Sequence, residues 1–175
     1  IAVYRGLAAR CNNPLHLGLT EAGMGAKGTV ASAAALSILL QEGIGDTIRV
    51  SMTGDPVQEV AAGFEILKAA GRQTRGVNFV SCPTCGRCGV DLENIARSVE
   101  EKLSGVETDR VITVAIMGCA VNGPGEASSA DVGIAAGKGE VLLFKQGKVL
   151  GKVPEEKAAD ALYSEVMAIL RGDRE

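Results

Sequence analysis

The order of the sequence patterns predicts an α/β protein made of two units, residues 1–73 and 77–175. In the first unit, short strands alternate with helical segments, as expected of parallel strands joined by crossover helices. In the second unit, strands predominate, and two of them run directly into cysteines. With 46% hydrophobic residues and 23 glycines, the chain has the composition of a globular rather than a disordered protein.

Two strands and three helices are predicted for the first unit. The strands span residues 15–20 and 48–53, and the helices lie before Asn12-Asn13-Pro14, over residues 29–41, and after Asp55-Pro56. The Asp-Pro pair is typical of a helix start, with Asp as the cap and Pro at the first helical position. The helix that it starts is expected to bury an apolar stripe, namely Val57, Val60, Ala61, Phe64 and Leu67.

Both strands place polar residues on one face and end in polar loops, unlike strands that are buried on both faces. In a (β/α) barrel, the inner face and the carboxyl ends of the strands form the active site, which directs attention to Glu21 and Arg49. A buried Arg49 guanidinium would need an anionic partner, either a bound phosphate or the Glu21 carboxylate. The glycine-rich loop 21–28 is either a simple turn or a phosphate loop with Lys27 as counter-charge. His16 is expected to be a hydrogen-bonded core residue.

The second unit is expected to combine helices with a larger set of strands. The predicted strands cover residues 77–81, 111–117, 131–136, 141–145 and 149–152. The last two form a hairpin across Gln146-Gly147. Asp91 is expected to cap one helix, and Pro154 to open the final one.

Four of the five cysteines lie in two stretches of the second unit, residues 82–88 with the spacing C-x-x-C-x-x-C and residues 118–126 with a single thiol. Soft thiolates are typical ligands of zinc and of iron–sulfur clusters. Cys82, Cys85, Cys88 and Cys119 could therefore form a site with four thiolates. The alternative is an ordinary pair of buried cysteines. Glu126, which follows a Gly-Pro-Gly turn, is a candidate oxygen ligand.

The remaining features limit the classes of function. A net charge of −3 without a basic block argues against nucleic acid as the main partner. The longest apolar run, residues 33–40, is too short to span a membrane, and no signal peptide is evident, so a cytoplasmic protein is expected. Because the chain opens on Ile1 within a helical pattern and lacks a first Met, we expect a missing beginning, and therefore no activity of the chain alone.

Four stretches resemble, in this order, the 4-hydroxy-3-methylbut-2-enyl diphosphate synthases of the methylerythritol phosphate route to isoprenoids: residues 16–25, 49–53, 81–87 and 118–126. The resemblance covers essentially the whole chain, and the last two stretches are highly specific. It implies the last strands of a TIM barrel, the substrate domain, over residues 1–73. It also implies a [4Fe–4S] domain over residues 77–175, an α+β domain similar to half of a sulfite or nitrite reductase.

The resemblance also implies the ligands of the cluster. The family binds one [4Fe–4S] cluster through three cysteines and a glutamate, which match Cys82, Cys85, Cys119 and Glu126 here. Cys88 stands where the family does not usually use a ligand, and it could replace Glu126 in an incomplete site.

The residues that match the family's substrate site are Glu21, Arg49, Ser51 and Asn122. The implied reaction is the reductive ring opening of 2-C-methyl-D-erythritol 2,4-cyclodiphosphate, with loss of a hydroxyl, to 4-hydroxy-3-methylbut-2-enyl diphosphate. Ferredoxin or flavodoxin would supply the electrons. Glu21 would be catalytic and move a proton, while Arg49 and Ser51 would hold the diphosphate. The family enzyme is a homodimer in which the cluster domain of one subunit closes the barrel of the other.

Two other interpretations start from the same cysteines. The first is a non-catalytic module in which zinc or a cluster supplies folding energy, and metal analysis separates it from the enzyme. The second is an iron–sulfur reductase that acts on a small oxyanion with sirohaem. A sirohaem pocket needs many basic residues, and few lie near these thiols in the sequence.

Overall fold

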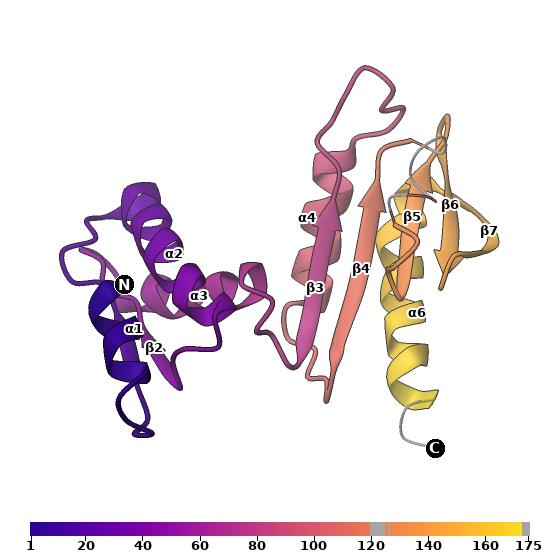
Figure 1. The fold of residues 1–175 in the computed structure, drawn as a ribbon. Coiled ribbons are helices and arrows are strands. Elements are labelled where there is room, and N and C mark those ends of the chain that lie inside the picture. Colours follow the sequence, from indigo (N-terminus) through magenta and orange to yellow (C-terminus); the bar gives the residue numbers. More distant parts are fainter. Residues whose placement is uncertain (120–124, 126, 173–175) are drawn as a thin grey trace. The chain divides into compact units, whose positions relative to one another are not determined.

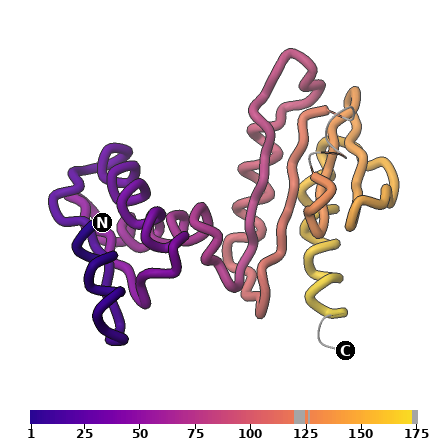
Figure 2. The backbone as a smooth tube through the Cα atoms, viewed as in Figure 1, coloured from indigo at the N-terminus to yellow at the C-terminus, as the bar shows by residue number. Residues whose placement is uncertain are grey.

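The computed structural model describes residues 1–119, 125 and 127–172 of the chain. The backbone separates into two compact units, Ile1–Gln73 and Thr74–Glu175 (Figures 1 and 2). Each unit mixes helices with strands, which confirms the predicted α/β class. Within the described ranges, no helix has both the length and the apolar character needed to cross a membrane.

Unit 1 contains its elements in the predicted order: α1 (Ala2–Ala8), β1 (His16–Gly18), α2 (Gly25–Gln41), β2 (Thr47–Arg49) and α3 (Pro56–Ala69). The two strands pair in parallel, with Gly18 opposite Arg49, and α2 forms the crossover between them. Leu17 of β1 is completely buried, and it belongs to one apolar cluster with Leu36 of α2 and Ile66 of α3.

Both strands of unit 1 are shorter than predicted, with three residues each. Each strand has only one partner in a two-stranded sheet, so the ladder ends where the two backbones diverge. The helix α2 begins at Gly25, one turn before the predicted start at Thr29. The residue before it, Met24, has an extended backbone. The glycine-rich loop between β1 and α2 is therefore shorter than the sequence suggested.

The predicted buried side of α3 is wrong. Val57, Val60 and Phe64 are 70, 60 and 62% exposed, whereas Ala62 and Ile66 are buried. The helix is apolar on two sides, and the side with Ala62 and Ile66 packs on α2 and the short sheet. Among the described residues, unit 1 offers no third strand that the other side could cover.

An ion pair fastens α1 to the carboxyl end of α2. Arg5 Nε donates to Glu42 Oε2 at 2.8 Å, and Arg5 Nη2 donates to Glu42 Oε1. The hydrogen bond from Arg5, together with its positive charge, lowers the pKa of the Glu42 carboxyl. The Tyr4 hydroxyl adds a 2.6 Å hydrogen bond to the His16 carbonyl, so α1 is held to both α2 and β1.

Unit 2 is built on one five-stranded sheet with the strand order β3-β4-β5-β6-β7. The elements described in this unit are β3 (Gly76–Ser81), α4 (Leu92–Leu103), β4 (Val111–Met117), β5 (Val132–Ala136), β6 (Glu140–Lys145), β7 (Lys148–Pro154), η1 (Glu155–Lys157) and α6 (Ala158–Gly172). The first three strands are parallel, and β6 and β7 continue the sheet antiparallel. The carboxyl ends of β3, β4 and β5 therefore lie at the same edge.

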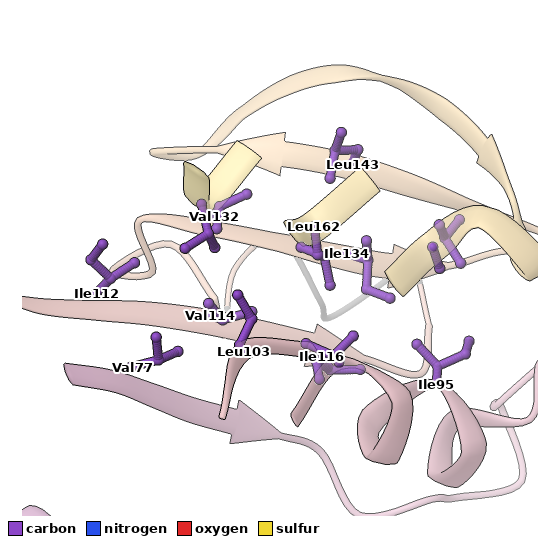
Figure 3. Close-up of a cluster of buried hydrophobic side chains, with 14 of the residues drawn as sticks. Val77, Ile95, Leu103, Ile112, Val114, Ile116, Val132, Ile134, Leu143 and Leu162 are labelled. Atoms are coloured by element: carbon purple, nitrogen blue, oxygen red, sulfur yellow. The ribbon is translucent and has the colours of Figure 1, made fainter. Parts of the chain in front are cut away.

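The helices α4 and α6 supply the apolar cover for one face of this sheet (Figure 3). Ile95 and Leu103 of α4 and Leu162 of α6 pack there against strand residues. The strand residues labelled in the figure are Val77, Ile112, Val114, Ile116, Val132, Ile134 and Leu143. On the opposite face, Met117 of β4 and Phe144 of β6 belong to a second apolar cluster. The strand β4 is thus buried on both faces, and it is the strand that leads to Cys119.

The hairpin predicted across Gln146-Gly147 joins β6 to β7. Both turn residues have positive φ, 48° and 74°, as a type I′ turn requires. The final helix differs from the prediction, because Pro154 ends β7 instead of opening α6. Pro154 is extended, with ψ at 143°, and it still pairs with Glu140. The single turn η1 then leads into α6, which begins at Ala158.

A buried hydroxyl joins the amino-terminal ends of β3 and β4. Thr108, which is 7% exposed, accepts the Gly76 N–H at 2.6 Å and donates to the Arg110 carbonyl. Gly76 begins β3 and lies opposite Val111, the first residue of β4. The Thr108 hydroxyl therefore fixes the start of the β3–β4 ladder.

Candidate functional site

The carboxyl ends of β3 and β4 bring two of the predicted thiols to one edge of the sheet. Ser81 lies opposite Ile116 in the ladder. The next residue, Cys82, continues the ladder by donating its N–H to the Ile116 carbonyl at 3.3 Å. The strand β4 ends at Met117, and the chain then runs through Gly118 to Cys119. Because β3 and β4 are parallel neighbours, the cysteines that follow their carboxyl ends lie at the same edge of the sheet. Thiolates in this arrangement can converge on one place.

Gly118 is the point that the sulfur atoms approach. Its N–H donates to Cys82 Sγ at 3.1 Å. The position that a Cβ would take at residue 118 lies 3.3 Å from Cys82 Sγ and 2.9 Å from Cys88 Sγ. A Leu92 methyl group, at the start of α4, lies 3.3 Å from the same position. The missing side chain of Gly118 therefore lets two thiols reach the backbone of β4 together.

Cys88 reaches this place through a turn in the loop after β3. Its N–H donates to the Cys85 carbonyl at 2.9 Å, and its Sγ donates to the Val90 carbonyl at 3.3 Å. Cys85 is exposed on the loop, while Cys82, Cys88 and Cys119 are half-buried. The structure thus places Cys88 beside Cys82, although the family resemblance gives Cys88 no role.

The rest of the predicted cluster site is only partly described. Glu126 and Asn122 lie outside the described residues. Among the residues that are described, no group of three or more His, Cys, Asp or Glu side chains is arranged to hold a metal ion. No disulfide links the cysteines of the described ranges. The site in this structure is therefore a thiol pair with further cysteines nearby in the sequence.

Unit 1 carries the second group of predicted site residues, at the carboxyl ends of β1 and β2. The Arg49 guanidinium covers Gly18, since a Cβ at residue 18 would lie 2.9 Å from Nη2 and 3.1 Å from Cζ. Arg49 Nη2 donates to Thr20 Oγ1 at 3.1 Å. The prediction of a buried guanidinium is wrong. Arg49 is the last residue of a three-residue strand, and its side chain crosses Gly18 to the surface.

Glu21 has an unusual backbone conformation. Its φ is 64°, in the left-handed region that residues other than glycine seldom adopt, and the residue is exposed. Backbone strain of this kind concentrates at functional sites. The loop that carries Glu21 is tied to the loop after β2, because the Thr53 N–H donates to the Gly23 carbonyl at 3.0 Å. Ser51, in the second loop, is half-buried. Glu21, Arg49 and Ser51 therefore share one end of the sheet.

The sequence patterns gave no role to two glycines of these sites, and the sequence placed one histidine in the core, which is wrong. Gly18 makes room for Arg49, and Gly118 makes room for the thiols. Only the strand register, which puts Gly18 opposite Arg49, gives the first of them a role. His16 is exposed rather than part of the core, although its Nδ1 does lie 2.7 Å from Thr47 Oγ1. His16 and Thr47 lie opposite each other in a two-stranded sheet that is too narrow to bury their side chains.

Comparison with known families matches both units. The family profile described as the GcpE TIM-barrel domain matches residues 1–64. The profile described as the GcpE protein C-terminal domain matches residues 78–168, more than half of the chain.

Curated relatives match along almost the whole chain. The chain is 59% identical over 170 residues to the 4-hydroxy-3-methylbut-2-en-1-yl diphosphate synthase (flavodoxin) of Geobacter sulfurreducens, which is 97% of this chain and 48% of that protein. The synthase of the same name from Clostridium acetobutylicum is 56% identical over 163 residues, 93% of this chain and 46% of that protein. The one from Aquifex aeolicus is 54% identical over 159 residues, 91% of this chain and 44% of that protein. The chain spans about half the length of the curated relatives it matches.

Proposed function

This chain belongs to the GcpE family, and from that membership we propose that it forms part of a 4-hydroxy-3-methylbut-2-enyl diphosphate synthase, the activity for which its relatives are named. The reaction would be the reductive ring opening of 2-C-methyl-D-erythritol 2,4-cyclodiphosphate with loss of a hydroxyl. The observation that carries the proposal is the arrival of Cys82 and Cys119 at one edge of paired parallel strands, in a chain so similar to named synthases.

The chemistry of this edge fits a [4Fe–4S] cluster. Cysteine thiolates are the usual ligands of such clusters, and backbone N–H groups commonly donate to the sulfurs, as Gly118 does to Cys82. By their match to the family, we propose Cys82, Cys85 and Cys119 as thiolate ligands and Glu126 as the oxygen ligand. A bound cluster would supply electrons one at a time. The likeness of unit 2 to half of a sulfite or nitrite reductase is part of the same proposal.

Unit 1 would bind the diphosphate of the substrate. Arg49 uses one of its N–H groups on Thr20, and the guanidinium is exposed, so other N–H groups can donate to phosphate oxygens. Ser51 follows at the same end of the sheet and would add a hydroxyl donor. Glu21, held in a strained conformation there, would give or take a proton. Asn122 is proposed as a polar neighbour of the substrate, by its match to the family.

The electron donor and the assembly follow from the family as proposals. The names of the relatives specify flavodoxin, which we propose as the donor here, with ferredoxin as the alternative. We further propose a cytoplasmic homodimer in which unit 1 of one subunit and unit 2 of the other complete a site. Because the chain covers about half of its relatives, turnover is a property to measure on the full-length protein, and the chain alone is expected to bind the cluster without turnover.

Anaerobic reconstitution with iron and sulfide tests the cluster. About four irons and four sulfides per chain, with broad charge-transfer absorption, would support it. Glu126→Ala should loosen the cluster without removing the thiolate ligands, whereas Glu100→Ala, a matched change on α4, should leave the spectrum unchanged. Stoichiometric zinc without sulfide would instead support the structural module, with Cys88 as the fourth thiolate.

A substitution of Glu21 tests its catalytic role. In the full-length protein, Glu21→Gln removes the ionisable group and should lower turnover by roughly 10²–10⁴-fold, the usual contribution of a positioned acid or base. Glu65→Gln, on the exterior of α3, serves as the control and should leave turnover unchanged. Near-normal turnover of Glu21→Gln would remove this residue from the mechanism and leave the cluster proposal intact.

A further inference from the structure

Cys88 is the one thiol of the loop after β3 for which the proposed cluster has no use. The Cys88 sulfur lies 2.9 Å from the position that a Cβ would take at residue 118, and the Cys82 sulfur lies 3.3 Å from the same position. The two sulfurs are therefore at most about 6 Å apart, within the range that a change of side-chain rotamer can close to a bond. Neither residue lies deep in the core, since both are half-buried.

We propose that Cys82 and Cys88 form a reversible disulfide when no cluster is bound. The oxidant is a small disulfide of the glutathione class. One cysteine thiolate attacks it and releases one small thiol, and the second cysteine then displaces the other small thiol from the mixed disulfide. In total, two cysteine thiols lose their hydrogens and form one S–S bond, while the small disulfide is reduced to two thiols.

The local structure favours this pair over the other pairings of the loop. The turn in which the Cys88 N–H donates to the Cys85 carbonyl carries the chain back to the end of β3. The same turn leaves the Cys85 side chain exposed. Gly118 leaves the space between the two sulfurs open, and any side chain at that position would hold them apart.

The disulfide would also control the cluster, a consequence that rests on the proposed function. Oxidation occupies Cys82, a proposed ligand, so the cluster could assemble only after reduction. At the same time, a disulfide protects the Cys82 sulfur from the irreversible oxidation that exposed thiolates undergo. The loop after β3 would thus have a stored state, oxidised and metal-free, and a competent state, reduced and ready for iron.

Peptide mapping of the whole, cluster-free chain tests the disulfide. The chain is incubated anaerobically with oxidised glutathione, alkylated and digested with trypsin, which places Cys82 and Cys85 in peptide 76–87 and Cys88 in peptide 88–97. The proposal expects these two peptides to be linked. The link should persist in Cys85→Ser and disappear in both Cys82→Ser and Cys88→Ser.

Three other maps would overturn the proposal. One is a disulfide within peptide 76–87, which would join Cys82 to Cys85. The second is a link to peptide 111–138, which carries Cys119. The third is the absence of any disulfide at glutathione ratios that oxidise ordinary vicinal thiols.

Iron uptake gives a second readout of the consequence for the cluster. The oxidised chain should take up no iron until dithiothreitol is added, whereas Cys88→Ser treated in the same way should take up iron at once. Cys11→Ser, a change in unit 1, should behave like the unchanged chain. An equal need for reduction in Cys88→Ser would break the connection between the pair and the cluster. If no chain binds a cluster under any condition, the proposed function fails, and the peptide map still decides whether the disulfide forms.

Discussion

Gly133 in β5 offers a sensitive test of how tightly β5 packs against its neighbours β4 and β6 in the sheet. In Gly133→Ala the new Cβ would lie 2.4 Å from Phe144 Cζ, 2.6 Å from the Ala115 carbonyl oxygen and 2.8 Å from Ala115 Cβ. Ala115 and Phe144 are the residues opposite Gly133 in β4 and β6. The phenyl ring can turn aside, but the carbonyl oxygen belongs to the backbone of the neighbouring strand.

The size of the effect follows from these distances. An ordinary contact begins near 3.4 Å, so the Ala115 oxygen and the new methyl must separate by about 0.8 Å. That movement strains the hydrogen bonds of a buried parallel ladder. Overpacking of a core typically costs about 1–3 kcal/mol. Because both flanking strands are affected, we expect Gly133→Ala to lower the free energy of unfolding of unit 2 by roughly 2–3 kcal/mol.

Urea unfolding followed by circular dichroism measures this change, and hydrogen exchange of peptides from β4 and β5 assigns it to unit 2. Gly151→Ala is the matched control, because Gly151 lies in β7 of the same sheet and a Cβ there meets no atom within 4 Å. Its effect should stay within about 0.5 kcal/mol. The reasoning is refuted if Gly133→Ala is as stable as the unchanged chain, or if both alanines destabilise equally.

Three further predictions concern unit 1. Asp55→Ala removes the cap that accepts the Val57 N–H at 3.0 Å, so urea unfolding should show a loss of about 1 kcal/mol, most of which Asp55→Asn should restore. Ser32→Ala should stabilise the unit by roughly 1 kcal/mol, because the buried Ser32 Oγ has no hydrogen-bond partner among the described residues; a loss of stability would contradict this. Since Arg5 lowers the pKa of Glu42, the pair stabilises the fold above the ordinary Glu pKa of 4.5, and this stabilisation is lost as the pH falls through the lowered value. Glu42→Gln should therefore lower Tm at pH 7 and match the unchanged chain at about pH 2; a constant difference would exclude this titration.

Features that depend on neighbouring residues could be predicted from the sequence. The strand β4 has the predicted bounds Val111–Met117, because it is a continuous apolar run with polar residues before it. The turn at Gln146-Gly147 was recognisable from the glycine, which adopts positive φ without strain. The caps of α3 and α4 followed from Asp55 and Asp91, whose carboxylates accept N–H groups of the first helical turn.

Features that depend on residues distant in the sequence could not be predicted in this way. The choice between the two apolar sides of α3 is decided by the number of strands beside it, which no local pattern contains. Arg49 was expected to be buried because apolar residues flank it, but its position at the end of a short strand leaves it exposed. The C-x-x-C-x-x-C spacing treats all three thiols alike, whereas the turn at Cys88 brings that residue to Cys82 and leaves Cys85 outside.

The buried Thr108 hydroxyl sits at the end of the β3–β4 ladder away from the cysteines, yet it bears on their spacing. A slip of one residue between these strands would move Cys82 along Gly118 by about 3.3 Å and turn every side chain of the slipped strand to the other face. The contact of Thr108 with Gly76 and Arg110 opposes such a slip at a distance of about 20 Å, the length of the six-residue ladder. A design that transfers these cysteines and their two strands to another protein would therefore have to include Thr108 and its two hydrogen bonds as well as the thiols.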